Sequence, residues 1–156
     1  MKLLFVCTGN ICRSPTAEGV LRQHLRRAGL ESVVTVDSAG THGYHVGDPP
    51  DPRSFATAAG RGVDLSALRA RRVQAEDFER FDLILAMDRE HLAHLTALAP
   101  AGSRAEIKLF LDFHPTLRGR DVPDPYYGGP GGFRDVFDMI DETSRALLAH
   151  VKTRLA

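Results

Sequence analysis

Apolar residues along the chain group into short continuous runs separated by longer mixed stretches. The first run, residues 2–7, is too short for a helix and ends at a polar loop that contains glycine, so it predicts a buried strand. Three later runs are short and either apolar or β-branched, and they predict strands at 33–38, 82–87 and 106–110.

Between these runs, apolar residues recur at helical spacing. The first helix is expected to begin with Ser14 as its N-cap and Pro15 at its first position, and to end at Gly29. The last helix is the most clearly patterned, because its apolar residues from Phe133 to Val151 share one face. Further helical segments are expected at 53–59, at 74–80 and, capped by Asp88, up to residue 98.

This alternation of strands and helices predicts an α/β fold in which helices cover both faces of a parallel sheet. A length of 156 residues is typical of one domain. Ligands of such folds bind at the carboxyl ends of the strands. We therefore expect catalytic residues in the loops 8–14, 38–52 and 112–132.

Charge and cysteine content narrow the possible classes of function. The chain has 20 Lys and Arg against 20 Asp and Glu, so a global electrostatic attraction to nucleic acid or membrane has no support. No apolar run is long enough to span a bilayer, and the run 2–7 is shorter than the core of a signal peptide. The two cysteines, Cys7 and Cys12, are too few for a disulfide framework, which favours a reducing cytoplasm.

The strongest chemical signal is the loop after the first strand, which reads CTGNICRSP from Cys7 to Pro15. A cysteine and an arginine separated by five residues form a weak motif when taken alone. Here the arginine precedes a helix, so the backbone N–H groups of the curled loop would point at a bound anion. Gly9 and Asn10 suit the left-handed dihedral angles that such a curl demands.

This loop suits a tetrahedral oxyanion, most naturally a phosphate ester. Arg13 supplies a planar fork for two oxyanion oxygens, and the positive field favours the thiolate of Cys7, a nucleophile that needs no separate base. The nucleotide-binding pattern GxxxxGK[ST] is absent. The residues expected around the phosphate are Thr8, Gly9, Asn10, Ile11, Cys12, Arg13 and Ser14.

Attack of a thiolate on a phosphate monoester requires an acid that protonates the leaving oxygen. The loop before the last helix offers Asp121 and Asp124, and we favour Asp124 because Pro125 stiffens the chain beside it. Tyr126 and Tyr127 follow directly and would form a wall for a substrate that carries a ring.

Together these motifs resemble those of the low-molecular-weight protein tyrosine phosphatases. The matching segments, in the family's order, are 6–15, 37–41, 46–53 and 124–129. The resemblance implies a single-domain three-layer sandwich over residues 1–156, with a four-stranded parallel sheet. It implies hydrolysis of phosphotyrosine and aryl phosphates through a phosphocysteine intermediate, without a metal or another cofactor. The implied roles are nucleophile for Cys7, phosphate clamp for Arg13, and general acid and then base for Asp124.

The resemblance also implies a network that braces the loop. In the family, side-chain hydrogen bonds hold the loop asparagine in a strained conformation, and the matching residues here are Asn10, Ser14 and Ser38. Ser14 is also expected to bond to the sulfur of Cys7. Many members carry a histidine near the position of Leu68, and a leucine cannot take that role, so the bracing of Asn10 is left open.

The pocket mouth and the second cysteine bear on selectivity and regulation. Thr8 stands where some members of the family have a larger apolar residue. Cys12 is either a small buried side chain or a resolving thiol that forms a reversible disulfide with oxidised Cys7. The expected aromatic rim of the pocket consists of Tyr44, Tyr126 and Tyr127.

Other polar residues are interpreted as ordinary structure, and no metal site is expected. Asp88, His91 and His94 share one helical face, which an N-cap and solvated polar groups explain better than a metal site does. Asp121 is interpreted as a loop residue. The basic cluster Arg69, Arg71 and Arg72 is interpreted as a solvated face, with attraction of acidic phosphopeptides as the alternative if it lies near the pocket mouth.

Two alternative functions would use the same loop. A thiol-dependent arsenate reductase needs further cysteines to relay a disulfide, and none follows Cys12. A non-catalytic phosphate-binding module would lack the nucleophile or the acid, whereas both Cys7 and Asp124 are present. The expected partners are a tyrosine-phosphorylated protein or a small aryl phosphate, with phosphate and other tetrahedral oxyanions as ligands, and neither nucleic acid nor membrane.

Overall fold

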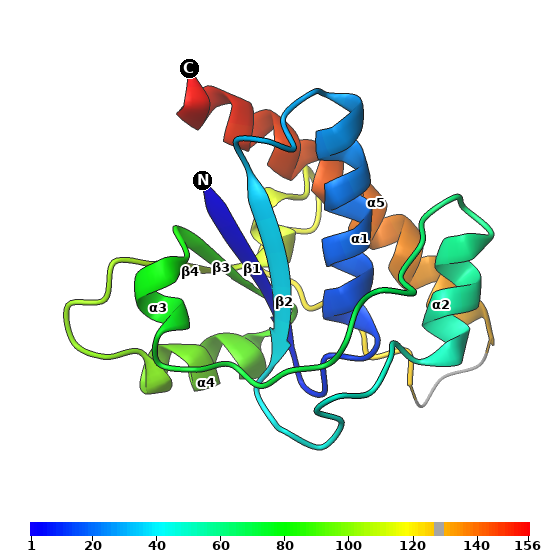
Figure 1. Cartoon of the computed structure of the whole chain (residues 1–156), viewed down its shortest axis with the longest axis horizontal. Coiled ribbons are helices and arrows are strands. Elements are labelled where there is room, and N and C mark those ends of the chain that lie inside the picture. The colour runs from blue at the N-terminus through cyan, green and yellow to red at the C-terminus, as the bar shows by residue number, and fades with distance from the viewer. Residues whose placement is uncertain (127–129) are drawn as a thin grey trace.

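The computed structural model describes residues 1–126 and 130–156 (Figure 1). Within these ranges, four strands form one parallel sheet in the order β2-β1-β3-β4. The strands are β1 (Lys2–Cys7), β2 (Thr35–Gly40), β3 (Leu83–Ala86) and β4 (Glu106–Leu109). The helices are α1 (Arg13–Arg27), α2 (Pro52–Ala59), α3 (Asp77–Arg80), α4 (Arg89–Leu98) and α5 (Pro130–Leu155), with the 3-10 helix η1 (Phe110–Phe113) after β4.

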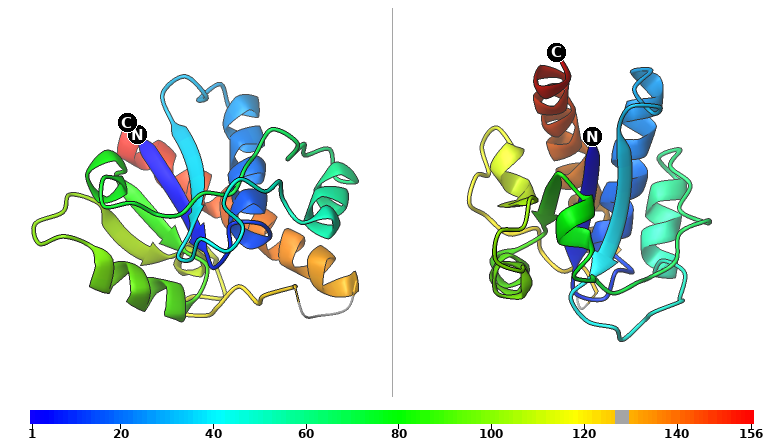
Figure 2. Two further views of the ribbon diagram at one scale, coloured as in Figure 1. Left: turned by 60° about the horizontal axis from the view of Figure 1, so that its bottom comes forward. Right: turned by 60° about the vertical axis from the view of Figure 1, so that its left-hand side comes forward.

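The sheet lies between two layers of helices, as expected. On β1, Leu3, Phe5 and Cys7 belong to the hydrophobic cluster that α1 and α5 cover. Leu4 and Val6, which alternate with them, belong to the cluster beneath α3 and α4. Figure 2 shows these helices on opposite sides of the strands. Because successive strand residues point to opposite faces, this alternation places the Cys7 side chain on the α1 and α5 side.

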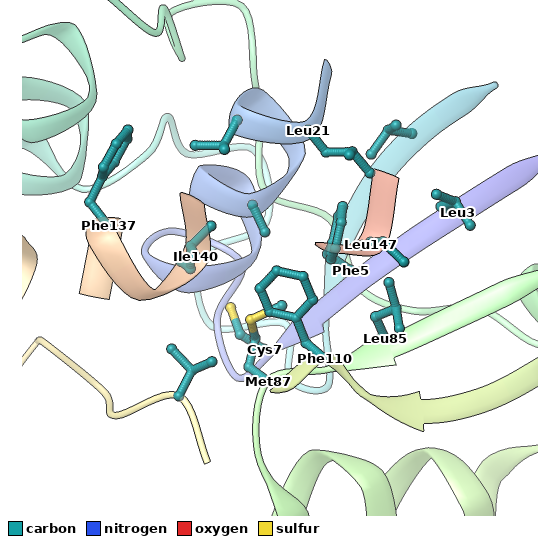
Figure 3. Close-up of a cluster of buried hydrophobic side chains, with 14 of the residues drawn as sticks. Leu3, Phe5, Cys7, Leu21, Leu85, Met87, Phe110, Phe137, Ile140 and Leu147 are labelled. Carbon is teal, nitrogen blue, oxygen red and sulfur yellow. The ribbon is translucent and has the colours of Figure 1, made fainter. Parts of the chain in front are cut away.

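The cluster on that side reaches directly to the reactive end of β1. Phe5 packs edge-on against Phe110, with ring centroids 5.3 Å apart. Figure 3 shows Cys7, the last residue of β1, and Met87, which follows β3, below these rings. The sulfur-bearing end of β1 is therefore supported by a close-packed core, which limits how far the loop after it can move.

Strand order explains why the site forms at β1. The chain passes from β1 to β2 on one side and later returns to β3 on the other, so the connections leave β1 in opposite directions. Such a switch point opens a crevice at the carboxyl ends of the strands. The loop after Cys7 occupies this crevice, next to the segments that follow β2 and β3.

Several predicted boundaries are wrong. Helix α3 begins at Asp77 rather than at residue 74, and strand β3 spans Leu83–Ala86 rather than 82–87. Helix α1 begins at Arg13, and Cys12 rather than Ser14 is its N-cap residue. The cap prediction failed because the hydroxyl of Ser14 bonds inward to the loop instead of to the helix N-terminus. Strand β2 begins at Thr35 rather than at residue 33, because the ladder pairs Lys2 with Thr35.

Other local predictions are confirmed. Asp88 caps α4, its carboxylate accepting a 2.9 Å hydrogen bond from the backbone N–H of His91. The apolar face of α5 is buried, as Ile140 and Leu147 illustrate. Of the helices in the described ranges, none combines the length and the apolar character needed to cross a membrane.

Candidate active site

A cavity of about 170 Å³ opens at the carboxyl end of β1. Residues 7–9 and 11–13 of the loop line it. Tyr44 and His45 enter from the segment after β2, and Asp124 and Tyr126 from the segment before α5. Residues from three separate parts of the chain therefore meet around one small space, which suits a compact anion with a side group at the mouth.

Cys7 lies at the base of this cavity and is 3% exposed. Its Sγ is 2.9 Å from the Oγ of Ser14. The position is the last residue of β1, so the core fixes the backbone that carries the sulfur while the side chain faces the cavity.

Asn10 supports the loop from behind. Its φ of 59° is the one positive φ outside glycine among the described residues. The side-chain Nδ2 donates to the hydroxyls of Ser14, at 2.8 Å, and Ser38, at 2.9 Å. Its Oδ1 accepts a 2.9 Å hydrogen bond from the backbone N–H of Arg71. A left-handed conformation costs free energy in a residue with a Cβ, and these three bonds offset that cost.

These bonds also determine the direction of the Ser14 hydroxyl. The N–H of Arg71 can only donate, so Asn10 must turn Oδ1 towards it and Nδ2 towards Ser14. The Ser14 oxygen is thus an acceptor, and its proton is available to Cys7 Sγ at 2.9 Å or to the Ala39 carbonyl at 3.4 Å. The shorter contact is to sulfur. Ser14 is therefore placed to donate to a thiolate and to stabilise it.

The second hydroxyl of this network is held by a buried carboxylate. Ser38 donates a 2.7 Å hydrogen bond to Oε1 of Glu18, which is 3% exposed. Arg22 donates to the other carboxylate oxygen at 2.6 Å. Burial raises the pKa of Glu18, while the bonds from Ser38 and Arg22 act in the opposite direction.

The absence of a histidine at Leu68 is compensated by the backbone. Leu68 is half-buried and packs against the hydrophobic core, and the N–H of Arg71 braces Asn10 instead. The interpretation of Arg71 as part of a solvated face is wrong, because its guanidinium bonds to Asp37 and to the buried Asp77. The same residue thus anchors its own segment while its N–H holds the loop.

Arg13 is 3% exposed and lies under the cavity. Its Nη1 donates to Oδ2 of Asp88 and to the carbonyl of Val122, both at 3.0 Å. Its Nη2 is 3.6 Å from Oδ2 of Asp124. These partners fix the plane of the guanidinium, and a fixed plane is what bidentate binding of an oxyanion requires.

Asp124, and not Asp121, is the acid that faces the cavity. The Asp124 side chain is 40% exposed, and its Oδ1 accepts a 3.0 Å hydrogen bond from the N–H of Tyr126. Asp121 instead accepts from the backbone and side chain of Arg89, at the start of α4. This ion pair lowers the pKa of Asp121 despite partial burial, which acts the other way.

The rim of the cavity is aromatic. Tyr44 is 72% exposed and stacks on His42, with ring centroids 5.1 Å apart. The guanidinium of Arg53 lies over the ring of Tyr126, 5.1 Å from its centroid. Tyr127, the third predicted rim residue, lies outside the described residues.

Cys12 is buried, and both cysteines are free thiols. Burial raises the pKa of Cys12 to about 12, although a hydrogen bond with Ser54 acts in the opposite direction. Cys12 and Cys7 line the same cavity. Cys12 is thus protonated at neutral pH.

The sequence-based interpretation missed the contribution of the segment after β3. Asp88 was assigned only a capping role, yet it also holds Arg13. His91 was assigned to a solvated face, yet it is 3% exposed and bonds to Thr8. The sequence held one signal of this contribution. Asp88 follows the carboxyl end of a predicted strand, which is where ligands bind in such folds. Among residues 1–126 and 130–156, no cluster of three or more His, Cys, Asp or Glu could hold a metal ion.

Comparisons with known proteins agree with this geometry. Residues 2–156 match the family model "Low molecular weight phosphotyrosine protein phosphatase". The chain is 45% identical to a putative low molecular weight protein-tyrosine-phosphatase of Synechocystis, over 99% of each chain. A crystal structure of a protein tyrosine phosphatase from Entamoeba histolytica superposes with a TM-score of 0.94 at 38% identity, covering 100% of this chain and 99% of the other.

A third relative is a phosphatase named for a different substrate. The crystal structure of a Drosophila arginine phosphatase superposes with a TM-score of 0.91 at 34% identity, covering 97% of this chain and 98% of the other. All three relatives are matched over nearly their whole length. The chain therefore belongs to the low molecular weight phosphotyrosine protein phosphatase family.

Proposed function

We propose that this chain is a metal-independent phosphatase that hydrolyses phosphotyrosine and aryl phosphate monoesters through a phosphocysteine intermediate. Residues 1–156 act as one domain in this proposal. The observation that carries it is a single cavity lined by Cys7, Arg13 and Asp124. These side chains supply a nucleophile, an oxyanion clamp and an acid, which are the three groups that the reaction requires.

In the first step, the phosphate of the substrate enters the loop 7–13. Arg13 and the backbone N–H groups of residues 8–14 bind its oxygens. The Cys7 thiolate attacks phosphorus in line with the leaving oxygen. The P–O bond breaks, and the carboxylic acid of Asp124 gives its proton to the departing phenoxide, so a phenol leaves.

In the second step, the Asp124 carboxylate takes a proton from water, whose oxygen attacks the phosphorus of phosphocysteine. The P–S bond breaks and inorganic phosphate forms. The hydroxyl of Ser14, 2.9 Å from Sγ, stabilises the departing thiolate of Cys7. The cycle consumes one water and one phosphate ester and needs no redox partner.

An aromatic leaving group fits the mouth of the cavity. Tyr44 and Tyr126 present rings on opposite chain segments, and Ile11 adds an apolar side chain. Phosphoarginine is the second candidate substrate, because an arginine phosphatase is among the related structures. The apolar lining at Ile11 favours a phenyl ring over a guanidinium group, which would lose hydration without gaining a partner there.

We also propose that Cys12 protects the nucleophile from oxidation. Peroxide converts the Cys7 thiolate to a sulfenic acid, the thiol of Cys12 condenses with it, and water leaves as a disulfide forms. Support comes from the placement of both sulfurs on one cavity. The proposed location of the protein is the cytoplasm, where thiols are kept reduced.

The function is tested by hydrolysis of p-nitrophenyl phosphate, a phosphotyrosine peptide and phosphoarginine in EDTA, from pH 4.5 to 8. Wild type is expected to turn over the two aryl esters, with Cys7→Ser inactive and Asp124→Asn reduced by roughly 10²- to 10⁴-fold. Asp121→Asn is the matched control and is expected to retain activity. Turnover of phosphoarginine alone would reassign the substrate, and phosphate binding without turnover of any ester would refute the enzyme proposal.

A further inference from the structure

The hydroxyl of Thr8, a half-buried residue, contacts the buried imidazole of His91, and the reaction steps above do not use this contact. The Oγ1 of Thr8 is 2.7 Å from Nε2 of His91. Thr8 directly follows Cys7, and His91 lies in the first turn of α4. The imidazole is 3% exposed, whereas Thr8 is half-buried and lines the cavity, so the histidine end of this contact is shielded from water.

The other ring nitrogen of His91 faces Asp88. Nδ1 is 3.1 Å from Oδ1 of Asp88, at an angle too poor for a good hydrogen bond. A lone pair on Nδ1 would be repelled by this carboxylate, whereas an N–H there is attracted. The proton of the neutral ring therefore resides on Nδ1. Nε2 then accepts the hydrogen bond that the hydroxyl of Thr8 donates.

These contacts join the two ends of the phosphate loop. Thr8 donates to His91, His91 faces Oδ1 of Asp88, and Oδ2 of Asp88 accepts from Nη1 of Arg13 at 3.0 Å. The backbone N–H of His91 also donates to Oδ1 of Asp88, at 2.9 Å. Asp88 is thus held from one side by His91 and holds Arg13 on the other.

We propose that Thr8 and His91 are a positioning pair that fixes the Asp88 carboxylate and, through it, the orientation of the Arg13 guanidinium. Without the pair, the imidazole and Asp88 have more freedom, and Arg13 must be ordered when the phosphate binds. The ordering cost then appears as weaker binding of phosphate. The kinetic consequence of this inference rests on the proposed function, but its binding consequence does not.

The charges around the imidazole keep it neutral over the working range. Burial lowers the pKa of His91 to about 4, with Arg13 acting in the same direction. Asp88, Asp124 and Asp121 act in the opposite direction. A neutral ring can accept from Thr8, whereas a protonated ring would have to donate at both nitrogens and would compete with Arg13 for Asp88.

Phosphate binding tests the pair without relying on turnover. Calorimetry would measure the affinity for inorganic phosphate in Cys7→Ser protein carrying Thr8→Val, His91→Phe or both. Each single change is expected to weaken binding roughly 3- to 10-fold, as the loss of one hydrogen bond predicts. The double change is expected to weaken it no more than the larger single effect, and Thr8→Ser is expected to stay within about twofold of Cys7→Ser alone.

His114→Phe is the matched control, because His114 is also buried but bonds to Glu142 of α5 and does not line the cavity. It is expected to change Tm without changing phosphate affinity. Additive single effects, or an unchanged affinity in Thr8→Val, would overturn the inference. So would nitrogen NMR that places the proton of neutral His91 on Nε2.

The same variants in active protein separate this inference from the proposed function. If the chain is a phosphatase, Thr8→Val and His91→Phe are expected to raise KM and the inhibition constant for phosphate more than they lower kcat. Suppose that no ester is hydrolysed but the Thr8 and His91 substitutions still show coupled effects on phosphate affinity. This result would refute the function and support the positioning pair. Normal turnover, without coupling between the Thr8 and His91 substitutions in phosphate binding, would support the function and refute the positioning pair.

Discussion

Asn10 and Arg71 are 61 residues apart in the chain, and a single 2.9 Å hydrogen bond from the backbone N–H of Arg71 to the Asn10 Oδ1 joins them. This bond orients the amide of Asn10, and the amide in turn orients the hydroxyl of Ser14 towards Cys7. A backbone group therefore performs the bracing for which Leu68 has no suitable atom. A backbone donor cannot be removed by substituting its side chain, so the test must be made at Asn10.

Replacing Asn10 is expected to separate the two contributions of this residue. Asn10→Gly removes three hydrogen bonds but adopts the positive φ without strain, and we expect kcat/KM for p-nitrophenyl phosphate to fall roughly 10- to 100-fold. Asn10→Ala removes the same bonds and adds about 1–2 kcal/mol of backbone strain, so its kcat/KM and Tm are expected to be lower still. Equal losses in the two variants would show that the positive φ carries no cost.

Gly40, at the end of β2, lies against the backbone of the phosphate loop. A Cβ there would be 2.6 Å from the carbonyl oxygen of Thr8 and 3.0 Å from that of His42. Gly40→Ala is therefore expected to displace the loop, to cost about 1–3 kcal/mol of unfolding free energy and to weaken phosphate binding. Urea denaturation and calorimetry would measure both effects.

Gly60 provides the matched control for that substitution. A Cβ at Gly60 would meet its nearest atom, the carbonyl oxygen of Ala56, at an ordinary 3.5 Å. Gly60→Ala is expected to leave stability within about 0.5 kcal/mol of wild type, or to raise it slightly. A Gly40→Ala protein as stable and as tight-binding as this control would contradict the predicted clash.

Tyr44 is expected to contribute to selectivity for aromatic esters. Tyr44→Ala should lower kcat/KM for phosphotyrosine more than for an alkyl phosphate, because stacking on the substrate ring is lost only for the aryl ester. Val46→Ala is the control, since Val46 is 59% exposed on the same segment but does not line the cavity. Equal losses for both esters would remove Tyr44 from the substrate rim.

Cys12→Ser is expected to abolish recovery from oxidation. After peroxide treatment, wild type should regain activity with dithiothreitol and show the mass of an internal disulfide, whereas Cys12→Ser should progress to irreversible oxidation of Cys7. Because the pKa of Cys12 is raised to about 12, disulfide formation should accelerate as pH rises from 7 to 9. Full recovery of the Cys12→Ser variant would show that Cys12 is only a buried side chain.

The low pKa of His91 predicts that its contribution to the free energy of unfolding depends on pH. Its pKa is about 4 in the folded chain and near its ordinary 6.5 when unfolded, so between these values the unfolded chain binds the proton and the folded chain does not. The stabilisation that comes from neutral His91 is therefore fully present above about pH 6.5 and is lost as pH falls towards 4. The free energy of unfolding is expected to fall by on the order of 2 kcal/mol between pH 7 and pH 5 from this residue.

Comparison with His91→Phe isolates this term from the carboxylates that titrate in acid. Wild type and variant would be unfolded with urea at pH 7, 6 and 5. The difference between their unfolding free energies is expected to shrink as the pH falls. A constant difference would show that His91 titrates alike in the folded and unfolded chains.

The curled loop after β1 could be predicted from the sequence because its features are local. Seven residues that leave a strand and enter a helix determine where backbone N–H groups point, whatever else the protein contains. The existence and order of the predicted strands and the long apolar face of the last helix were also correct, although the ends of the strands were not, since periodicity reports which side of an element is buried and not where it stops. The prediction of Ser14 as the N-cap was wrong because its hydroxyl bonds to Cys7 and Asn10 rather than to the N-terminus of the helix.

The sequence by itself determined the α/β layers and predicted the curled loop with Cys7 and Arg13 at its two ends, because these features depend on neighbouring residues and on hydrophobic period. Only the tertiary structure decided which distant groups hold them: Arg71 against Asn10, and Asp88 and His91 against Arg13 and Thr8. The last two contacts span 75 and 83 residues. They exist because β3 lies beside β1 in the sheet, and that adjacency results from the packing of the whole chain rather than from any local pattern.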